Sequence, residues 1–150
     1  FYSNLGDCYN KTKEYSASDS SFDKALEIDP NEPFVLNNYA YYLSVRKEKL
    51  DQAEKMSKHS NELQPNQSSF LDTYGWILFQ EGKYDEAKKW IEKAMENGGE
   101  NSGTILEHYG DILFKLNQSE KAFEYWKKAK QSGDASGLLD QKIRDKKLYE

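Results

Sequence analysis

The chain is poor in cysteine, in proline and in long apolar runs. Its 150 residues include one cysteine, Cys8, and three prolines. A single cysteine excludes an internal disulfide, and we expect Cys8 to pack between helices as a small apolar residue. No apolar run approaches the roughly 20 residues that a membrane-spanning helix needs, and no signal peptide is visible. We therefore expect no direct membrane insertion.

The beginning of the chain leaves the compartment open. Phe1 is not an initiator methionine, and Tyr2 already lies on the packing face of the first unit. The chain therefore reads as a fragment or a processed form of a longer protein. The cytoplasm remains one option, and the bacterial periplasm or envelope is another if the N-terminus was truncated.

Charge and histidine content argue against two further classes of function. The chain has 26 acidic and 21 basic residues and a net charge of −5. General binding to DNA or RNA needs clustered lysine and arginine, so we expect no nucleic-acid partner. His59 and His108 have no second soft ligand at metal-binding spacing, and both are interpreted as solvent-facing or groove-facing. We predict no catalytic residue, no metal and no cofactor.

A glycine-rich segment, Gly98 to Gly103, superficially resembles a phosphate-binding loop. It lacks the lysine of a P-loop, and it follows a helical pattern where that motif follows a strand. We interpret it as a loop between repeats, with Asn101 or Ser102 capping the next helix.

The chain's main feature is a repeat of small residues at intervals of 34 or 35. Three registers keep step along the chain: Gly6, Ala40, Gly75 and Gly110; Ser18, Ala53, Ala87 and Ala122; Ala25, Ser60, Ala94 and Ala129. A period of this length is typical of stacked supersecondary units, each too small to bury its own apolar face.

Within one unit the apolar spacing is helical. Leu71, Gly75 and Leu78 stand at i, i+4 and i+7 and line one helix face. A tight turn at Gly82 follows. A second helix then carries small residues seven apart, so that another helix can approach closely. Each unit is therefore predicted to be a helix–turn–helix.

These residues resemble the tetratricopeptide repeat, and the sequences of the later units are similar to those of bacterial members. The third unit matches nearly every defining place: Leu71, Gly75, Leu78, Gly82, Tyr84, Ala87, Ile91 and Ala94. The resemblance implies an all-α fold, a right-handed α–α superhelix forming a single domain. We expect four repeats at about 1–30, 31–65, 66–99 and 100–133, a capping helix at about 135–149, nine helices in all and no strand.

Two departures from the pattern carry structural expectations. Ser57 places a hydroxyl where Phe22, Ile91 and Trp126 stand in the other units, so the second unit is expected to pack less tightly. The same unit has one extra residue in its turn, near 46–49. In the expected cap, Leu138, Leu139 and Ile143 form one stripe, and the lysines around them are interpreted as a solvated outer face.

The resemblance also implies that the first helix of each unit lines a concave groove that holds a peptide. At about 100° per residue, the side away from the packing face carries Asp72, Thr73, Trp76 and Gln80, with Phe79 on the flank as a packing residue. The matching places in the other units complete the predicted groove: Asn37, Asn38 and Tyr41; Glu107, His108, Asp111 and Phe114.

Function is therefore expected to come from shape. The leading hypothesis is an interaction module or scaffold that binds a protein segment. Because Asp72, Glu107 and Asp111 give the predicted groove a negative potential, the segment is expected to be basic or partly apolar. Two alternatives stay open: the docking or regulatory array of a larger enzyme, and a structural array that associates with itself. A monomer or a weak homo-oligomer is expected.

Overall fold

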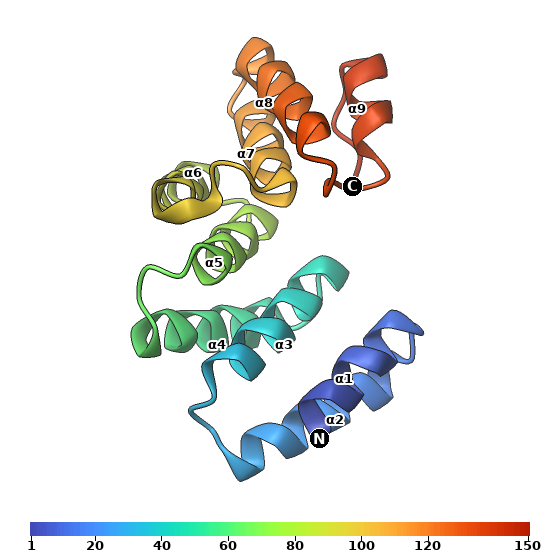
Figure 1. Cartoon of the computed structure of the whole chain (residues 1–150), viewed down its shortest axis with the longest axis vertical. Helices are drawn as coiled ribbons and strands as arrows, with labels where there is room; N and C mark the ends of the chain where they lie inside the picture. Colours follow the sequence, from blue (N-terminus) through green and yellow to red (C-terminus); the bar gives the residue numbers. More distant parts are fainter. The chain divides into compact units, whose positions relative to one another are not determined.

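The structure is a computed structural model that describes all residues from Phe1 to Glu150. It contains nine α-helices, one short π-helical turn and no strand (Figure 1). The helices are α1 (Tyr2–Lys11), α2 (Tyr15–Ile28), α3 (Pro33–Arg46), α4 (Leu50–Leu63), α5 (Ser68–Gln80), α6 (Tyr84–Ala94), α7 (Gly103–Lys115), α8 (Ser119–Ser132) and α9 (Leu139–Asp145), and the π turn η1 spans Met95–Gly99. The predicted all-α helical-repeat class and the number of helices are confirmed.

The helices fall into two compact units. Unit 1 is Phe1–Pro65 and holds α1 to α4, while unit 2 is Asn66–Glu150 and holds α5 to α9. In unit 1, α1 packs on α2 and α3 packs on α4, and α3 also contacts α1 and α2. In unit 2, α5 packs on α6 and α7 on α8; α7 also contacts α5 and α6, and α9 packs on α8.

The turn within each hairpin needs a left-handed backbone at the same register position. Gly82 has φ 81°, and Lys13, Lys47 and Asn117 take the same place with φ of 64°, 57° and 61°. Only one of the four turns uses glycine, the residue for which this conformation carries no steric cost. The extra residue expected near 46–49 is visible as Lys49, which is also left-handed, with φ 46°.

Glycines in the first helices stand where a second helix crosses closely. A Cβ there would meet the facing side chain at 2.8 Å for Gly6 and Phe22, 2.7 Å for Gly75 and Ile91, and 2.4 Å for Gly110 and Trp126. The fourth crossing differs, because Ala40 stands in the glycine register and Ser57 in that of the large side chains. Both are fully buried. The smaller partner leaves room for the methyl group of Ala40.

Two sequence predictions about individual segments are corrected here. Cys8 is exposed and does not lie between helices, because it falls on the outer side of α1. The expected cap at 135–149 is a shorter helix, α9, of seven residues. Leu139 of α9 is buried in a cluster with Leu106, Trp126 and Ala129, whereas Leu138 is 38% exposed. None of the nine helices has the length and apolar character needed to span a membrane.

Candidate functional site

The predicted groove face is largely buried on α5. Asp72, Thr73 and Trp76 are only 6%, 3% and 8% exposed, so the expectation that this side of the helix is open is wrong. The imidazole of His108 on α7 stacks on the indole of Trp76 with 3.9 Å between ring centroids. Its Nδ1 lies 2.8 Å from Oδ1 of Asp72. The next first helix in the unit therefore covers part of the face that α5 was expected to present.

His108 is an internal partner of Asp72. It is 8% exposed, which overturns its interpretation as a solvent-facing or groove-facing histidine. Burial alone would lower the pKa of His108, but the negative charge of Asp72 and its hydrogen bond outweigh burial and raise that pKa above its ordinary value. The protonated ring can donate to the carboxylate.

Two buried carboxylates on α7 are covered by the C-terminal helix. Glu107 and Asp111 are 4% and 2% exposed, and the Nζ of Lys142 on α9 lies 2.9 Å from Glu107 Oε1 and 2.8 Å from Asp111 Oδ2. Lys142 itself is 3% exposed. The prediction of a fully solvated lysine face is therefore wrong for this residue, which points inward from α9 because it lies on the same side of that helix as Leu139 and Ile143.

The two carboxylates have opposite pKa directions. Burial raises the pKa of Asp111 to about 6, although Lys142 and His108 oppose the rise. Burial also disfavours ionised Glu107, but hydrogen bonds from Ser136 and Lys142 outweigh it and lower the pKa of that carboxyl. Trp126 Nε1 donates to Asp111 Oδ1 at 2.9 Å. The negative potential expected from these acids is thus largely neutralised within unit 2.

Two predicted residues of unit 2 are less buried than the others. Gln80 and Phe114 are partly exposed. Phe114 stacks on Trp126 with 5.7 Å between ring centroids. Phe79, expected to pack, is 3% exposed and stacks on Trp76. Most predicted groove residues of α5 and α7 are therefore engaged in contacts within unit 2.

In unit 1 the equivalent face of α3 is partly exposed. Asn38 and Tyr41 are partly exposed, and two large apolar side chains on the same helix, Phe34 and Val45, are 52% and 53% exposed. These four residues stand at i, i+4, i+7 and i+11, so they fall within an arc of about 60° on one helix face. We call them the α3 stripe. Because exposed apolar side chains lie along one helix face, the α3 stripe is a candidate interaction surface.

The surroundings of the stripe are partly fixed by unit 1 itself. Tyr42 donates its hydroxyl to Oδ1 of Asp7 on α1 at 3.0 Å, which ties α3 to α1 beside the stripe. Asn37, also predicted for the groove, is 7% exposed, and its Nδ2 lies 3.4 Å from Oδ1 of Asn38. Its own Oδ1 is buried without a hydrogen-bond partner. Asn37 therefore belongs to the interior beside the stripe.

Sequence reasoning missed Phe34 and Val45. Phe34 stands seven residues before Tyr41, outside the predicted stretch, and Val45 stands four residues after it, at the place that Gln80 takes in the third repeat. Extending the helical period in both directions from Tyr41 would have found them. The same step leads to Ser69 and Gln80 on α5 and to Thr104 and Lys115 on α7, so only α3 carries apolar side chains at both of these places.

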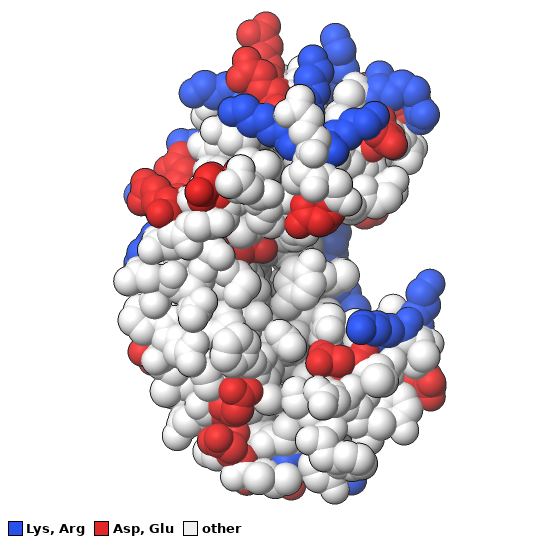
Figure 2. Space-filling view, viewed as in Figure 1, with Lys and Arg blue, Asp and Glu red and all other residues white.

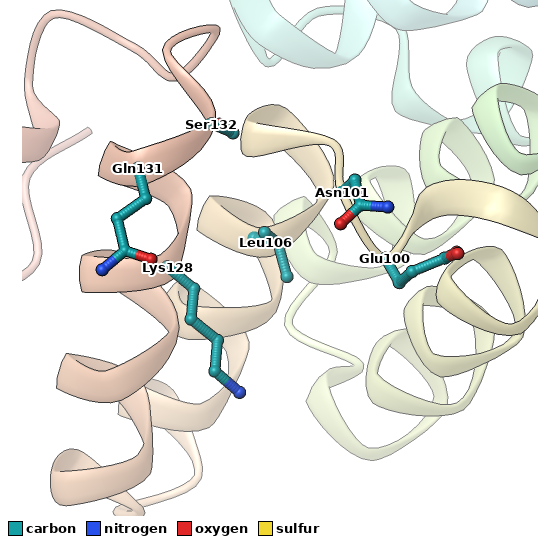
Figure 3. A pocket seen from close by; sticks show the side chains of 6 residues that line it. All are labelled: Glu100, Asn101, Leu106, Lys128, Gln131 and Ser132. Atoms are coloured by element: carbon teal, nitrogen blue, oxygen red, sulfur yellow. The ribbon is translucent and has the colours of Figure 1, made fainter.

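A separate cleft of about 300 Å³ lies in unit 2 between the loop after α6 and helices α7 and α8. Its lining is mostly polar: Glu100, Asn101, Leu106, Lys128, Gln131 and Ser132 (Figure 3). Ser102, next to this loop, caps α7 as predicted, since its Oγ accepts from the backbone N–H of Ile105. Glu100 and Lys128 are the charged residues of its lining.

Charged side chains are unevenly distributed on the face drawn in Figure 2. Over α8 and α9, lysine, arginine and acidic side chains crowd together, whereas the surface over α3 and α4 is largely uncharged. Six of the seven large apolar side chains exposed in the chain also belong to unit 1: Phe1, Tyr15, Ile28, Phe34, Val45 and Leu63. Unit 1 is therefore the more apolar of the two surfaces.

Comparisons with known proteins agree with this architecture. A sequence model of the tetratricopeptide repeat matches residues 1–139. The chain therefore belongs to the tetratricopeptide-repeat family, and its fold is that of a protein–protein interaction repeat module. No match is found among curated protein sequences.

Several solved structures are similar in fold. PilF of Pseudomonas aeruginosa is 24% identical, with a TM-score of 0.74 over 97% of this chain and 69% of that one. PilW, described as a widely conserved type IV pilus biogenesis factor, is 17% identical, with a TM-score of 0.80 over 97% and 68%. MamA of MSR-1 is 20% identical, with a TM-score of 0.68 over 88% and 75%. At these identities the similarity concerns the fold alone. The bacterial origin of PilF agrees with the similarity of the repeat sequences to bacterial members.

Proposed function

We propose that this chain is a non-enzymatic interaction module that holds a peptide or protein segment on the α3 stripe of unit 1. The observation that carries the proposal is the spacing and exposure of Phe34, Asn38, Tyr41 and Val45 on one helix face. Aromatic side chains at the centre of an interface supply much of its binding free energy. An asparagine amide adds a donor and an acceptor for the backbone of the bound segment.

The chemistry of the stripe favours a partly apolar ligand. Phe34 and Val45 at its ends offer apolar contact, and Tyr41 offers an aromatic face with a polar tip. The carboxylate of Asp7 lies beside the stripe through its hydrogen bond with Tyr42. Together with the net charge of −5, it favours a segment that also carries lysine or arginine. The acids of α5 and α7 add little to this preference, because His108 and Lys142 already pair with them.

A peptide library graded in charge and apolar content tests the proposal. Binding of each peptide is measured by fluorescence anisotropy on the full chain and on Phe34→Ala and Tyr41→Ala variants. Since each variant removes a stripe anchor, affinity should fall about tenfold or more. Ile28→Ala is the matched control, because Ile28 is 74% exposed but lies on α2, off the stripe. It should leave affinity unchanged.

The same titrations decide the ligand class. Basic, partly apolar peptides should bind best, and more weakly as salt rises, because charge attraction is screened. If the best ligands bind the Tyr41→Ala variant as tightly as the wild type, the α3 stripe is not their site. If acidic peptides bind best, the charge preference is wrong even where the site is right.

A further inference from the structure

Unit 2 contains a complete binding site for an ammonium group. The Nζ of Lys142 lies 2.9 Å from Glu107 Oε1 and 2.9 and 2.8 Å from the two carboxylate oxygens of Asp111. An ammonium has three donors, so its hydrogen-bonding capacity can be met within this cluster. The lysine side chain is 4% exposed. Such a site distinguishes a lysine from an apolar side chain of the same length.

The acceptors of this site are held mainly by groups outside α9. Asp111 Oδ1 accepts from Trp126 Nε1 on α8 at 2.9 Å, and Glu107 accepts from the backbone N–H and the hydroxyl of Ser136 in the linker. Without a cation, two buried carboxylates would be left unpaired, which costs free energy. The site therefore keeps its shape and its preference for a cation when the lysine comes from another helix.

The present occupant is held by a short helix. α9 has seven residues, and its apolar side is Leu139 and Ile143, joined by Leu148 beyond its end. These side chains lie on the cluster that includes Trp126 and Ala129. A linker with glycines at 133 and 137 connects α9 to α8. A helix this short adds little internal stability of its own.

The sequence spacing shows what kind of element α9 replaces. Polar contacts join consecutive first helices at one repeat's distance: Asp7 to Tyr42, and Asp72 to His108, 35 and 36 residues apart. Glu107 and Lys142 are also 35 apart. α9 therefore stands where the first helix of a further repeat would stand.

We propose that the Glu107–Asp111 site on α7 is a second docking site, filled in cis by Lys142, and that a partner's amphipathic helix takes it by displacing α9. The partner helix carries a lysine with apolar residues three positions before it and one after it, as in Leu139, Lys142 and Ile143. These places lie on one helix face. The inference goes beyond the function proposed for α3 and involves other residues, so either can fail alone.

A fluorescent peptide with the chain's own sequence 134–150 serves as the probe. It is titrated into the full chain and into a full-chain Ile143→Ala variant, which weakens the apolar contact of α9 without touching the carboxylates. Because α9 competes in cis, the variant should bind the peptide at least about tenfold more tightly than the wild type. Circular dichroism and thermal melting establish that the variant is folded.

Two matched changes show whether the lysine site is responsible. A peptide carrying Lys142→Met should lose about tenfold or more in affinity, and so should the intact peptide on an Ile143→Ala, Asp111→Asn chain. The peptide carrying Lys147→Met is the control and should bind like the original, since Lys147 is exposed. If the Lys142→Met peptide binds as well as the original, the lysine site is not what recognises it, and the proposal is wrong.

Hydrogen exchange of the wild-type full chain gives an answer that needs no variant. Amides of α9 should exchange faster than those of α7 and α8, because α9 opens on its own. Adding the peptide should speed their exchange further. Amides of α9 that exchange as slowly as those of α8 would show that the cap opens only with the whole unit, which overturns displacement.

Discussion

Units 1 and 2 use the same positions of the repeat for different purposes. Tyr41 on α3, Trp76 on α5 and Asp111 on α7 each follow the small residue of the first helix. Tyr41 remains partly exposed on an open stripe, whereas Trp76 and Asp111 are 8% and 2% exposed within a packed cluster. The position in the repeat fixes the helix face but not how far that face is buried.

The difference comes from what the following helix supplies. α7 offers His108 to Asp72 and Trp76, and α9 offers Lys142 to Glu107 and Asp111. A cationic side chain one repeat later in the sequence pairs with these carboxylates, so the acidic face becomes buried inside unit 2. A buried carboxylate needs such a partner. The α3 stripe, with its apolar and amide groups, has no such charge to be neutralised.

The comparison is tested most strongly by truncating the two aromatic residues at the same repeat position. Trp76→Ala should lower the free energy of unfolding by about 3–5 kcal/mol, because a buried indole leaves a cavity and loses its stacking on His108 and Phe79. Tyr41→Ala should cost about 1 kcal/mol or less, since partly exposed side chains contribute less burial. Urea unfolding monitored by circular dichroism measures both. Equal losses in the two variants would mean that the open and packed faces are not energetically distinct.

A second test concerns the close helix crossing in unit 2. Gly110→Ala places a Cβ 2.4 Å from Cδ1 of Trp126, so the domain should lose about 1–3 kcal/mol through overpacking. Gly137→Ala is the matched control, because a Cβ there meets nothing within 4 Å. Thermal melting of both variants measures the difference. A Gly110→Ala chain that melts like the control would contradict the assignment of this position to the crossing.

Much of the fold could be predicted from the sequence. The spacing of Gly75, Ala87 and Ala94 is local and repeated, so it indicates the hairpins and the crossing without knowledge of the tertiary structure. The departure at Ser57 could also be predicted, because each of the other three repeats has a large side chain at that place. Such features depend on periodicity and side-chain size, which a single sequence displays directly.

Whether the residues of the candidate site are buried or exposed could not be predicted in the same way. Whether Asp72 faces solvent depends on a histidine 36 residues later, and whether Glu107 does so depends on a lysine 35 residues later. Lys142 looked like one of several surface lysines, since α9 is too short to show a clear period. Once the repeat length is known, an acidic residue followed by a basic residue about one repeat later indicates that the two side chains can pair.

The pH dependence of stability sharpens the contrast, because the buried histidine lies only in unit 2. The folded pKa of His108 is raised above an unfolded value of about 6.5. Its stabilising contribution is therefore fully present below about pH 6.5 and is lost as pH rises through the raised value. Urea unfolding from pH 6.5 upward should show this loss in the wild type and a smaller one in His108→Gln.

Asp111 also makes the folded chain less stable as pH rises, but over a lower pH range. The reason is that its folded pKa is raised from 3.8 to about 6. The His108→Gln chain keeps Asp111, so the loss that remains in that chain is assigned to this carboxyl. The NMR titration of His108 should give a midpoint above 6.5 in the wild type, and the midpoint should fall in Asp72→Asn, where burial acts without the carboxylate. A midpoint that does not move in Asp72→Asn would show that this carboxylate does not set the pKa.

The smallest expected effect is at the crossing of α3 and α4 in unit 1. The hydroxyl of Ser57 is buried without a hydrogen-bond partner, and an unsatisfied buried polar group costs free energy. Ser57→Ala removes that group and keeps a small side chain beside Ala40, so the chain should become more stable by up to about 1 kcal/mol. Ser18→Ala is the matched control in the same unit, because the hydroxyl of Ser18 donates to the carbonyl of Gly6 at 2.8 Å. That variant should instead lose about 0.5–1.5 kcal/mol. Parallel urea titrations of the two variants settle the signs, and a loss in Ser57→Ala equal to that in Ser18→Ala would mean that the Ser57 hydroxyl is hydrogen-bonded in solution.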